Sequence, residues 1–203
     1  NLTEDNKYRS FLHPLRTIIA PPKETLKVWD ELNQKRKVVG IGGIDAHAHK
    51  YNLVGFFFFF LFPYKVLFKS IRTHILINEA IKKGKSAKDI ETAKWQIYNS
   101  LREGRCFIAN DYVAESKGFR FYAEHDAVKY QMGDKVPDHK NVTLKVFLPK
   151  INAEIKLLRN GHIIETNKGI DAEFVINKKG AFRIEVFYEE RAWIYSNHIR
   201  VNI

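Results

Sequence analysis

Three side chains of types that commonly bind metal ions follow one another closely in the first half of this chain. Asp45, His47 and His49 are spaced two residues apart. On an extended chain, side chains two positions apart share a face, so all three can point the same way. A carboxylate and imidazoles that project together suit a divalent metal ion. The spacing therefore predicts part of a metal site.

The residues before this group predict the elements that would position it. The apolar run at Val38–Ile41 predicts a buried strand that ends where the polar residues begin. In α/β sheets and barrels, chemistry sits at that end of a strand. Upstream, the spacing of Leu26, Trp29 and Leu32 predicts a helix over 23–34, opened by a Pro-Pro pair.

A second helix and strand are predicted further along. Ser86 is a good N-cap with Asp89 as its capping-box partner, and the helix should run to about Glu103 and end at Gly104. A strand over 105–109 follows. The apolar residues expected on the buried side of this helix are Ile90, Ala93, Trp95, Ile97 and Leu101. Helix–strand alternation favours a parallel α/β arrangement.

The pattern changes near Gly118 to short alternating runs with turns between them. Asn160-Gly161 is a strong hairpin signal. The predicted strands are 119–124, 142–148, 153–159, 162–165, 172–176, 181–188 and 192–201. Strands of this length and spacing are typical of an immunoglobulin-like β-sandwich. We therefore expect an α/β domain over 1–116 and an all-β domain over 117–203.

The residues around Asp45 resemble a known family. Gly42-Gly43-Ile44-Asp45-Ala46-His47 is similar to the last metal-binding motif of the PHP (polymerase and histidinol phosphatase) hydrolases, most closely in the carbaryl-hydrolase-like subgroup. The other segments similar to that subgroup are Trp29-Asp30-Glu31-Leu32, Phe62-Pro63-Tyr64, Arg72-Thr73-His74 and Gly104-Arg105-Cys106-Phe107. The resemblance covers roughly residues 10–203, and members of the subgroup can carry a β-sandwich after the catalytic domain.

The resemblance implies a distorted (β/α) barrel that holds two or three Mn, Zn or Fe ions and hydrolyses phosphoesters or related small-molecule esters. Asp45 and His47 match the final ligand pair of the family. His49 is not required by the motif, and a surface histidine is its alternative. Arg72 and His74 lie in a segment near the family's active site, where Arg72 would hold an anionic oxygen. Structural hydrogen bonding is the alternative for both.

The sequence departs from the family in two respects. No His-x-His precedes Asp45, and Ile44 replaces a small polar residue. We therefore expect the C-terminal half of a barrel with an incomplete metal site, inactive without its N-terminal half. For this chain alone, a partial metal site and the absence of bound metal are the two alternatives. The alternative is a non-catalytic module whose sandwich binds a partner or a saccharide.

Composition limits the remaining hypotheses. The formal charge of +11 is spread over both halves, and no aromatic–basic motif supports nucleic-acid binding. Cys106 is the single cysteine, so no disulfide can form within the chain, and its apolar neighbours predict burial. No secretory signal opens the chain, which favours a cytoplasmic location. The histidines in the second half are expected at the surface or in turns; they are His125, His139, His162 and His198. Trp95 and Trp193 are expected in the core.

The run Leu53–Phe62 is the most apolar part of the chain. It holds about ten residues, whereas a helix needs roughly twenty to span a bilayer. Five successive phenylalanines cannot share one face of a strand, so both faces need cover. Together with the Val38–Ile41 strand of a half barrel, this run predicts a homodimer or a rearranged first half that buries it.

Overall fold

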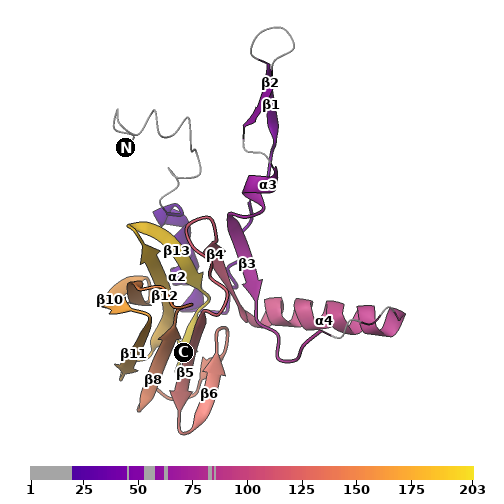
Figure 1. The fold of residues 1–203 in the computed structure, drawn as a ribbon. Coiled ribbons are helices and arrows are strands. Elements are labelled where there is room, and N and C mark those ends of the chain that lie inside the picture. Colours follow the sequence, from indigo (N-terminus) through magenta and orange to yellow (C-terminus); the bar gives the residue numbers. More distant parts are fainter. Residues whose placement is uncertain (1–19, 45, 53–57, 62–63, 82–83, 85) are drawn as a thin grey trace.

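Two antiparallel sheets form the body of the fold (Figure 1). The computed structural model describes residues 20–44, 46–52, 58–61, 64–81, 84 and 86–203. The larger sheet has the order β10-β9-β12-β13-β4-β3, and β14 pairs with both β12 and β7. Its strands are β3 (Ile71–Ile75), β4 (Cys106–Asn110), β7 (Lys135–Val136), β9 (Ala153–Arg159), β10 (His162–Gly169), β12 (Gly180–Tyr188), β13 (Arg191–Ser196) and β14 (Ile199–Val201).

The smaller sheet has the order β11-β8-β5-β6. Its strands are β5 (Arg120–His125), β6 (Val128–Gln131), β8 (Val142–Phe147) and β11 (Asp171–Ile176). Alternate residues of β8 are buried, and Leu144 is one of them, whereas Lys145 points outward to Glu124 and Glu173. The buried faces of both sheets share one hydrophobic core that includes Phe121 and Trp193. This arrangement confirms the predicted β-sandwich.

Local signals in the second half identified most of its strands. Asn160 and Gly161 have φ values of 52° and 85°, and Arg159 pairs with His162 across them. Two positive φ values in a two-residue loop define the type I′ hairpin that Asn-Gly favours. The strands β6 and β7 were not predicted, because both are short and β7 has only two residues.

The first half of the chain does not form the predicted parallel arrangement. β4 pairs antiparallel with both β3 and β13, and the one parallel pair among the described strands joins β7 to β14. Phe107 and Ala109 of β4 enter the sandwich core, which is why this strand extends the larger sheet. No (β/α) barrel forms among the described residues. The strand β4 lies before the expected domain boundary at residues 116 and 117, and β13, with which it pairs, lies after it.

The helix α4 (Ala87–Glu103) has the predicted ends. The Ser86 hydroxyl accepts a hydrogen bond from the Asp89 amide, and Gly104 takes a left-handed conformation with φ of 77°. The predicted burial of its apolar side is wrong, since Ile90 is 59% exposed and Trp95 is 44% exposed. Figure 1 shows α4 projecting away from the sheets. Helical spacing identifies an apolar side but does not supply a neighbour to cover it.

Two further elements complete the described part of the first half. A hairpin joins β1 (His49–Asn52) to β2 (Phe58–Leu61), and the short helix α3 (Tyr64–Leu67) precedes β3. Residues 53–57 and 62–63 lie outside the described residues, as do the side chains of 58–61, so the predicted burial of the phenylalanine run stays a prediction. None of the described helices is long and apolar enough to cross a membrane.

Candidate functional site

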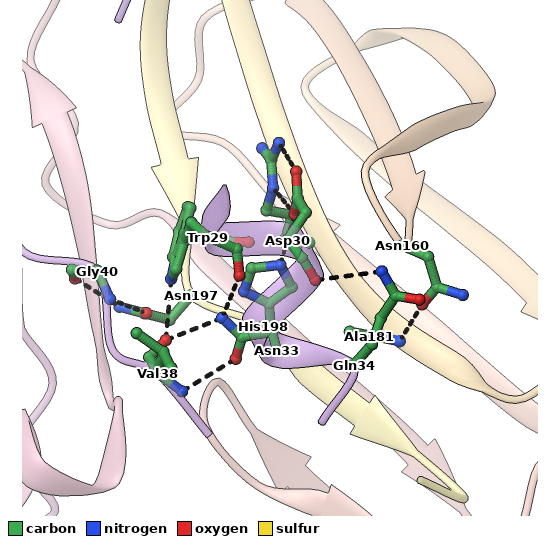
Figure 2. A network of polar contacts seen from close by, with 12 residues as sticks. Trp29, Asp30, Asn33, Gln34, Val38, Gly40, Asn160, Ala181, Asn197 and His198 are labelled. Atoms are coloured by element: carbon green, nitrogen blue, oxygen red, sulfur yellow. Dashed lines mark hydrogen bonds and ion pairs between the residues drawn. The ribbon is translucent and has the colours of Figure 1, made fainter. Parts of the chain in front are cut away.

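The helix α2 (Lys23–Asn33) was predicted correctly, but the side chains that it buries are polar. Asp30 forms hydrogen bonds with Arg183 of β12 and with His198 of the β13–β14 loop. Figure 2 shows Asp30 beside His198. Its Oδ1 accepts a hydrogen bond from Arg183 Nε at 2.6 Å and lies 2.7 Å from His198 Nε2, and its Oδ2 accepts from Arg183 Nη2 at 2.7 Å. Arg183 Nη1 also donates to Glu185 at 2.6 Å.

The network places one buried cation, Arg183, between two carboxylates, Asp30 and Glu185. Burial opposes the charged form of Asp30, but hydrogen bonds from Arg183 and His198 outweigh it, so the pKa of the carboxyl lies below its ordinary value. Burial lowers the pKa of His198, and the imidazole is therefore neutral at pH 7. A neutral ring with Nε2–H donating to Asp30 leaves Nδ1 without a proton, and that buried atom has no partner among the described residues.

The segment 38–42 follows α2 and is held along its length by side chains. The Val38 carbonyl accepts from Trp29 Nε1 at 2.9 Å. Three polar side chains then form paired hydrogen bonds with the backbone of alternate residues: Asn33 with Val38, Asn197 with Gly40 and Thr73 with Gly42. These side chains take the place of a neighbouring strand. The predicted strand over Val38–Ile41 is therefore wrong, although its backbone groups are satisfied as a strand's would be.

The glycines in this segment have a packing role. A Cβ atom on Gly40 would lie 2.5 Å from the Trp29 ring, and one on Gly42 would lie 2.6 Å from Ile108. A Cβ atom on Gly43 would meet nothing within 4 Å. Gly40 and Gly42 therefore allow the backbone to lie directly on α2 and β4.

The structure places only part of the predicted metal group. Asp45 lies outside the described residues. His47 is exposed. His49 is the first residue of β1, and its side chain is not among those that the structure describes. No group of three or more His, Cys, Asp or Glu side chains suited to a metal ion occurs among the described residues. The convergence of Asp45, His47 and His49 thus stays a prediction.

Arg72 and His74 of β3 both contact Asp111. Arg72 Nη1 lies 3.2 Å and His74 Nε2 lies 2.9 Å from Asp111 Oδ2, and Arg72 Nε donates to the Phe68 carbonyl. Ser116 Oγ donates to Asp111 Oδ1 at 2.6 Å and lies 3.0 Å from the same His74 Nε2.

This Ser, His and Asp group is not arranged for nucleophilic catalysis. A catalytic triad uses opposite nitrogens of the imidazole for the carboxylate and the hydroxyl, whereas Asp111 and Ser116 here meet one nitrogen. Ser116 is also fully buried. Asp111 Oδ1 accepts the Ser116 amide, and Asn110 Oδ1 accepts the Tyr112 amide. The group therefore closes the loop after β4.

Several side chains do not lie where the sequence placed them. His198 and His125 were predicted at the surface or in turns; His198 lies in the β13–β14 loop and His125 ends β5, but both side chains are buried. Trp95 was predicted in the core and is exposed. Trp193 and Cys106 are buried as predicted. Burial raises the pKa of the Cys106 thiol to about 11, which makes it unreactive at neutral pH. One sequence feature could have predicted the buried network: Arg183 and Glu185 are two charged residues on one face of an otherwise apolar strand.

Two hollows flank α2. A cavity of about 710 Å³ reaches Asp30, Arg183 and Tyr195. Another, of about 590 Å³ and mainly apolar, lies between α2, residues 38–43 and Trp193. Both have volumes usual for small-molecule sites. Comparison of the chain with known protein families, curated proteins and solved structures finds no match.

Proposed function

We propose that this chain is the C-terminal portion of a PHP-type metal-dependent hydrolase that acts on phosphoesters or related esters. It would contribute one corner of the metal site, formed by Asp45 and His47, with His49 beside them. In this proposal the sandwich is immunoglobulin-like, and the segments before it belong to a catalytic domain that would form its barrel only together with the N-terminal half. The proposal rests on the resemblance of Gly42–His47 to the last metal motif of that family.

The single observation that supports it most is how the segment before Asp45 is held. Paired side-chain hydrogen bonds secure alternate residues from Val38 to Gly42, three residues before Asp45. A metal ligand must be held closely in place, and groups behind it that are themselves hydrogen-bonded provide this. Asn197 belongs to the sandwich, so the sandwich would serve as the support of the metal corner.

The chemistry would need more ligands than this corner offers. A bound Mn, Zn or Fe ion would polarise the ester and lower the pKa of water to about 7. Asp45 and His47 would supply two of its ligands, fewer than the three protein ligands usual at a catalytic zinc. We therefore propose that the chain alone does not turn over substrate and that the remaining ligands come from an N-terminal half.

The test compares the chain with the longest polypeptide encoded in the same reading frame. Hydrolysis of bis(p-nitrophenyl) phosphate with added Mn²⁺ should require the longer protein. In it, Asp45→Ala and His47→Ala should each lower kcat/KM by at least 100-fold, while His162→Ala, at an exposed hairpin position, should not. A longer protein without metal-dependent hydrolysis, or one that tolerates Asp45→Ala, would exclude the proposal.

A second candidate function is a non-catalytic interaction module, here a homodimer. The observation that favours it is exposed apolar surface in the first half: Ile41 is 68% exposed, and the backbone groups of Val39 and Ile41 have no hydrogen-bond partner among the described residues. A second copy could pair with this edge. Light scattering at about 100 µM would give twice the monomer mass for a dimer, and Ile41→Lys should restore the monomer. A monomer throughout would exclude this candidate.

A further inference from the structure

A third hollow lies beside β3, β4, β5 and β6 and is lined by positive charge. Its volume is about 480 Å³, within the usual range for a small-molecule site. The connector after β3 and residues of β4, β5 and β6 form its wall. Its basic residues are Arg105, Lys117, Arg120 and Lys129, and no Asp or Glu is among the described residues that line it.

The Arg105 guanidinium has N–H donors without close acceptors. Its Nε is buried and has no hydrogen-bond partner among the described residues. Its Nη1 reaches Asn78 Oδ1 at 3.4 Å, and its Nη2 lies 3.9 Å from Asp134 Oδ1. Asp134 uses its other oxygen to accept the Gln131 amide at 2.7 Å. The Arg105 side chain lines the hollow and is 29% exposed, so an anion there could accept hydrogen bonds from the Nη groups, whose present contacts are long.

Two of the other cations contact neutral groups. Arg120 Nη1 donates to the Phe119 carbonyl at 2.9 Å, and Lys129 Nζ lies 3.5 Å from the Tyr122 ring centroid. Lys117 has no carboxylate partner among the described residues. Glu124 of β5 lies opposite Lys129 of β6, but its carboxylate forms an ion pair with Lys145 at 2.9 Å. The positive charge that lines the hollow is therefore largely uncompensated.

We propose that this hollow binds a small ligand through a phosphate group. Two guanidinium groups can chelate a tetrahedral oxyanion with paired N–H donors, which lysines alone cannot do. Arg105 would bind deepest, and Lys117, Arg120 and Lys129 would neutralise the charge at the mouth. The limited volume favours a small molecule over a nucleic-acid strand. No residue of 38–49 is among the described residues that line the hollow, so the proposal does not depend on metal binding at Asp45 and His47.

Titration calorimetry with inorganic pyrophosphate tests the site on the whole chain, with citrate as a comparison of similar charge. We expect saturable one-to-one binding and at least tenfold weaker citrate. Lys117→Gln with Arg120→Gln changes two exposed positions and should weaken pyrophosphate at least tenfold. The matched control is Lys88→Gln with Lys94→Gln on the projecting helix α4, which should change affinity less than twofold.

A second readout reports on the buried donor. The Arg105 Nε–H resonance should shift on addition of pyrophosphate in the unsubstituted chain and much less in the Lys117/Arg120 double variant. The proposal is overturned if pyrophosphate does not saturate, if citrate binds more tightly, if the α4 control weakens binding equally, or if the Arg105 resonance does not move.

Discussion

Asp30→Asn is the substitution that most sharply probes how α2 is attached. The asparagine keeps the size of the side chain and removes its charge. Asp30 is 3% exposed and Arg183 is 1% exposed, so water cannot replace the lost interactions. The change removes the ionic hydrogen bonds to Arg183 at 2.6 and 2.7 Å and leaves that guanidinium with Glu185 alone.

Removing one partner of a buried ion pair costs about 3–5 kcal/mol. Glu185 still compensates the charge of Arg183, so the cost here comes from the lost ionic hydrogen bonds and from the asparagine NH2 group, which would face guanidinium donors. Urea unfolding should therefore show a loss near about 4 kcal/mol. With a slope of about 2 kcal/mol per molar urea, the midpoint should fall by about 2 M. Circular dichroism follows the sheets, and Trp29 fluorescence, read in variants without the other tryptophans, reports on α2 locally.

Glu31→Gln on the same helix is the control. Glu31 lies 3.9 Å from Lys27 in an exposed pair, whose loss should cost about 0.5 kcal/mol or less. In a double-mutant cycle, Arg183→Met should cost much less in the Asp30→Asn background than in the original chain. The reasoning is refuted if Asp30→Asn costs under about 1 kcal/mol, since exposed pairs cost that much, or if the two changes are additive.

Three further predictions concern pH, thiol reactivity and packing. Because the pKa of His198 is lowered, its contribution to stability is fully present above about pH 6.5 and falls below that pH, where the unfolded state takes up a proton. The lowered pKa of Asp30 adds a loss of stability as pH falls below about 4. Urea midpoints across pH 3–8 should show the first decline in the original chain and less of it in His198→Gln, and an unchanged pH profile in that variant would contradict this prediction. Cys106, with a pKa of about 11, should react with a disulfide reagent at pH 8 at least 100-fold more slowly in the folded chain than in urea, and equal rates would contradict its burial. Gly40→Ala places a Cβ atom 2.5 Å from the Trp29 ring and should lower the free energy of unfolding by about 1–3 kcal/mol. Gly43→Ala, whose Cβ atom meets nothing within 4 Å, should change it little. Equal losses in the two variants would contradict the packing role of Gly40.

Local features of the fold could be predicted because neighbouring residues determine them. Asn160-Gly161 specifies its turn through backbone conformation, and Ser86 and Gly104 specify the ends of α4 through capping. The alternation in β8 reports one buried face. These interactions extend over a few residues, so a single sequence carries them.

Partners that are distant in sequence could not be predicted in the same way. The pairing of β4 with β13 depends on residues more than 80 positions away, and an apolar run fits a parallel or an antiparallel neighbour equally. His198 was predicted at the surface or in a turn, because nothing local in the sequence indicates that Asp30 of α2 lies beside it. The same applies to the cationic hollow, whose lysines and arginines come from β5, from β6 and from the segments before β4 and β5.

The most direct measurement of the central claim is selective broadening of amide resonances by Mn²⁺ in the isotope-labelled chain. Paramagnetic broadening detects weak binding, which is what a corner with two or three ligands should give. We predict that substoichiometric Mn²⁺ broadens the resonances of residues 43–49 first, and that Asp45→Ala abolishes this while Asp171→Ala, at an exposed strand position, does not. Broadening that is absent from 43–49, or that persists there in Asp45→Ala, would contradict the claim that Asp45 and His47 form a metal corner.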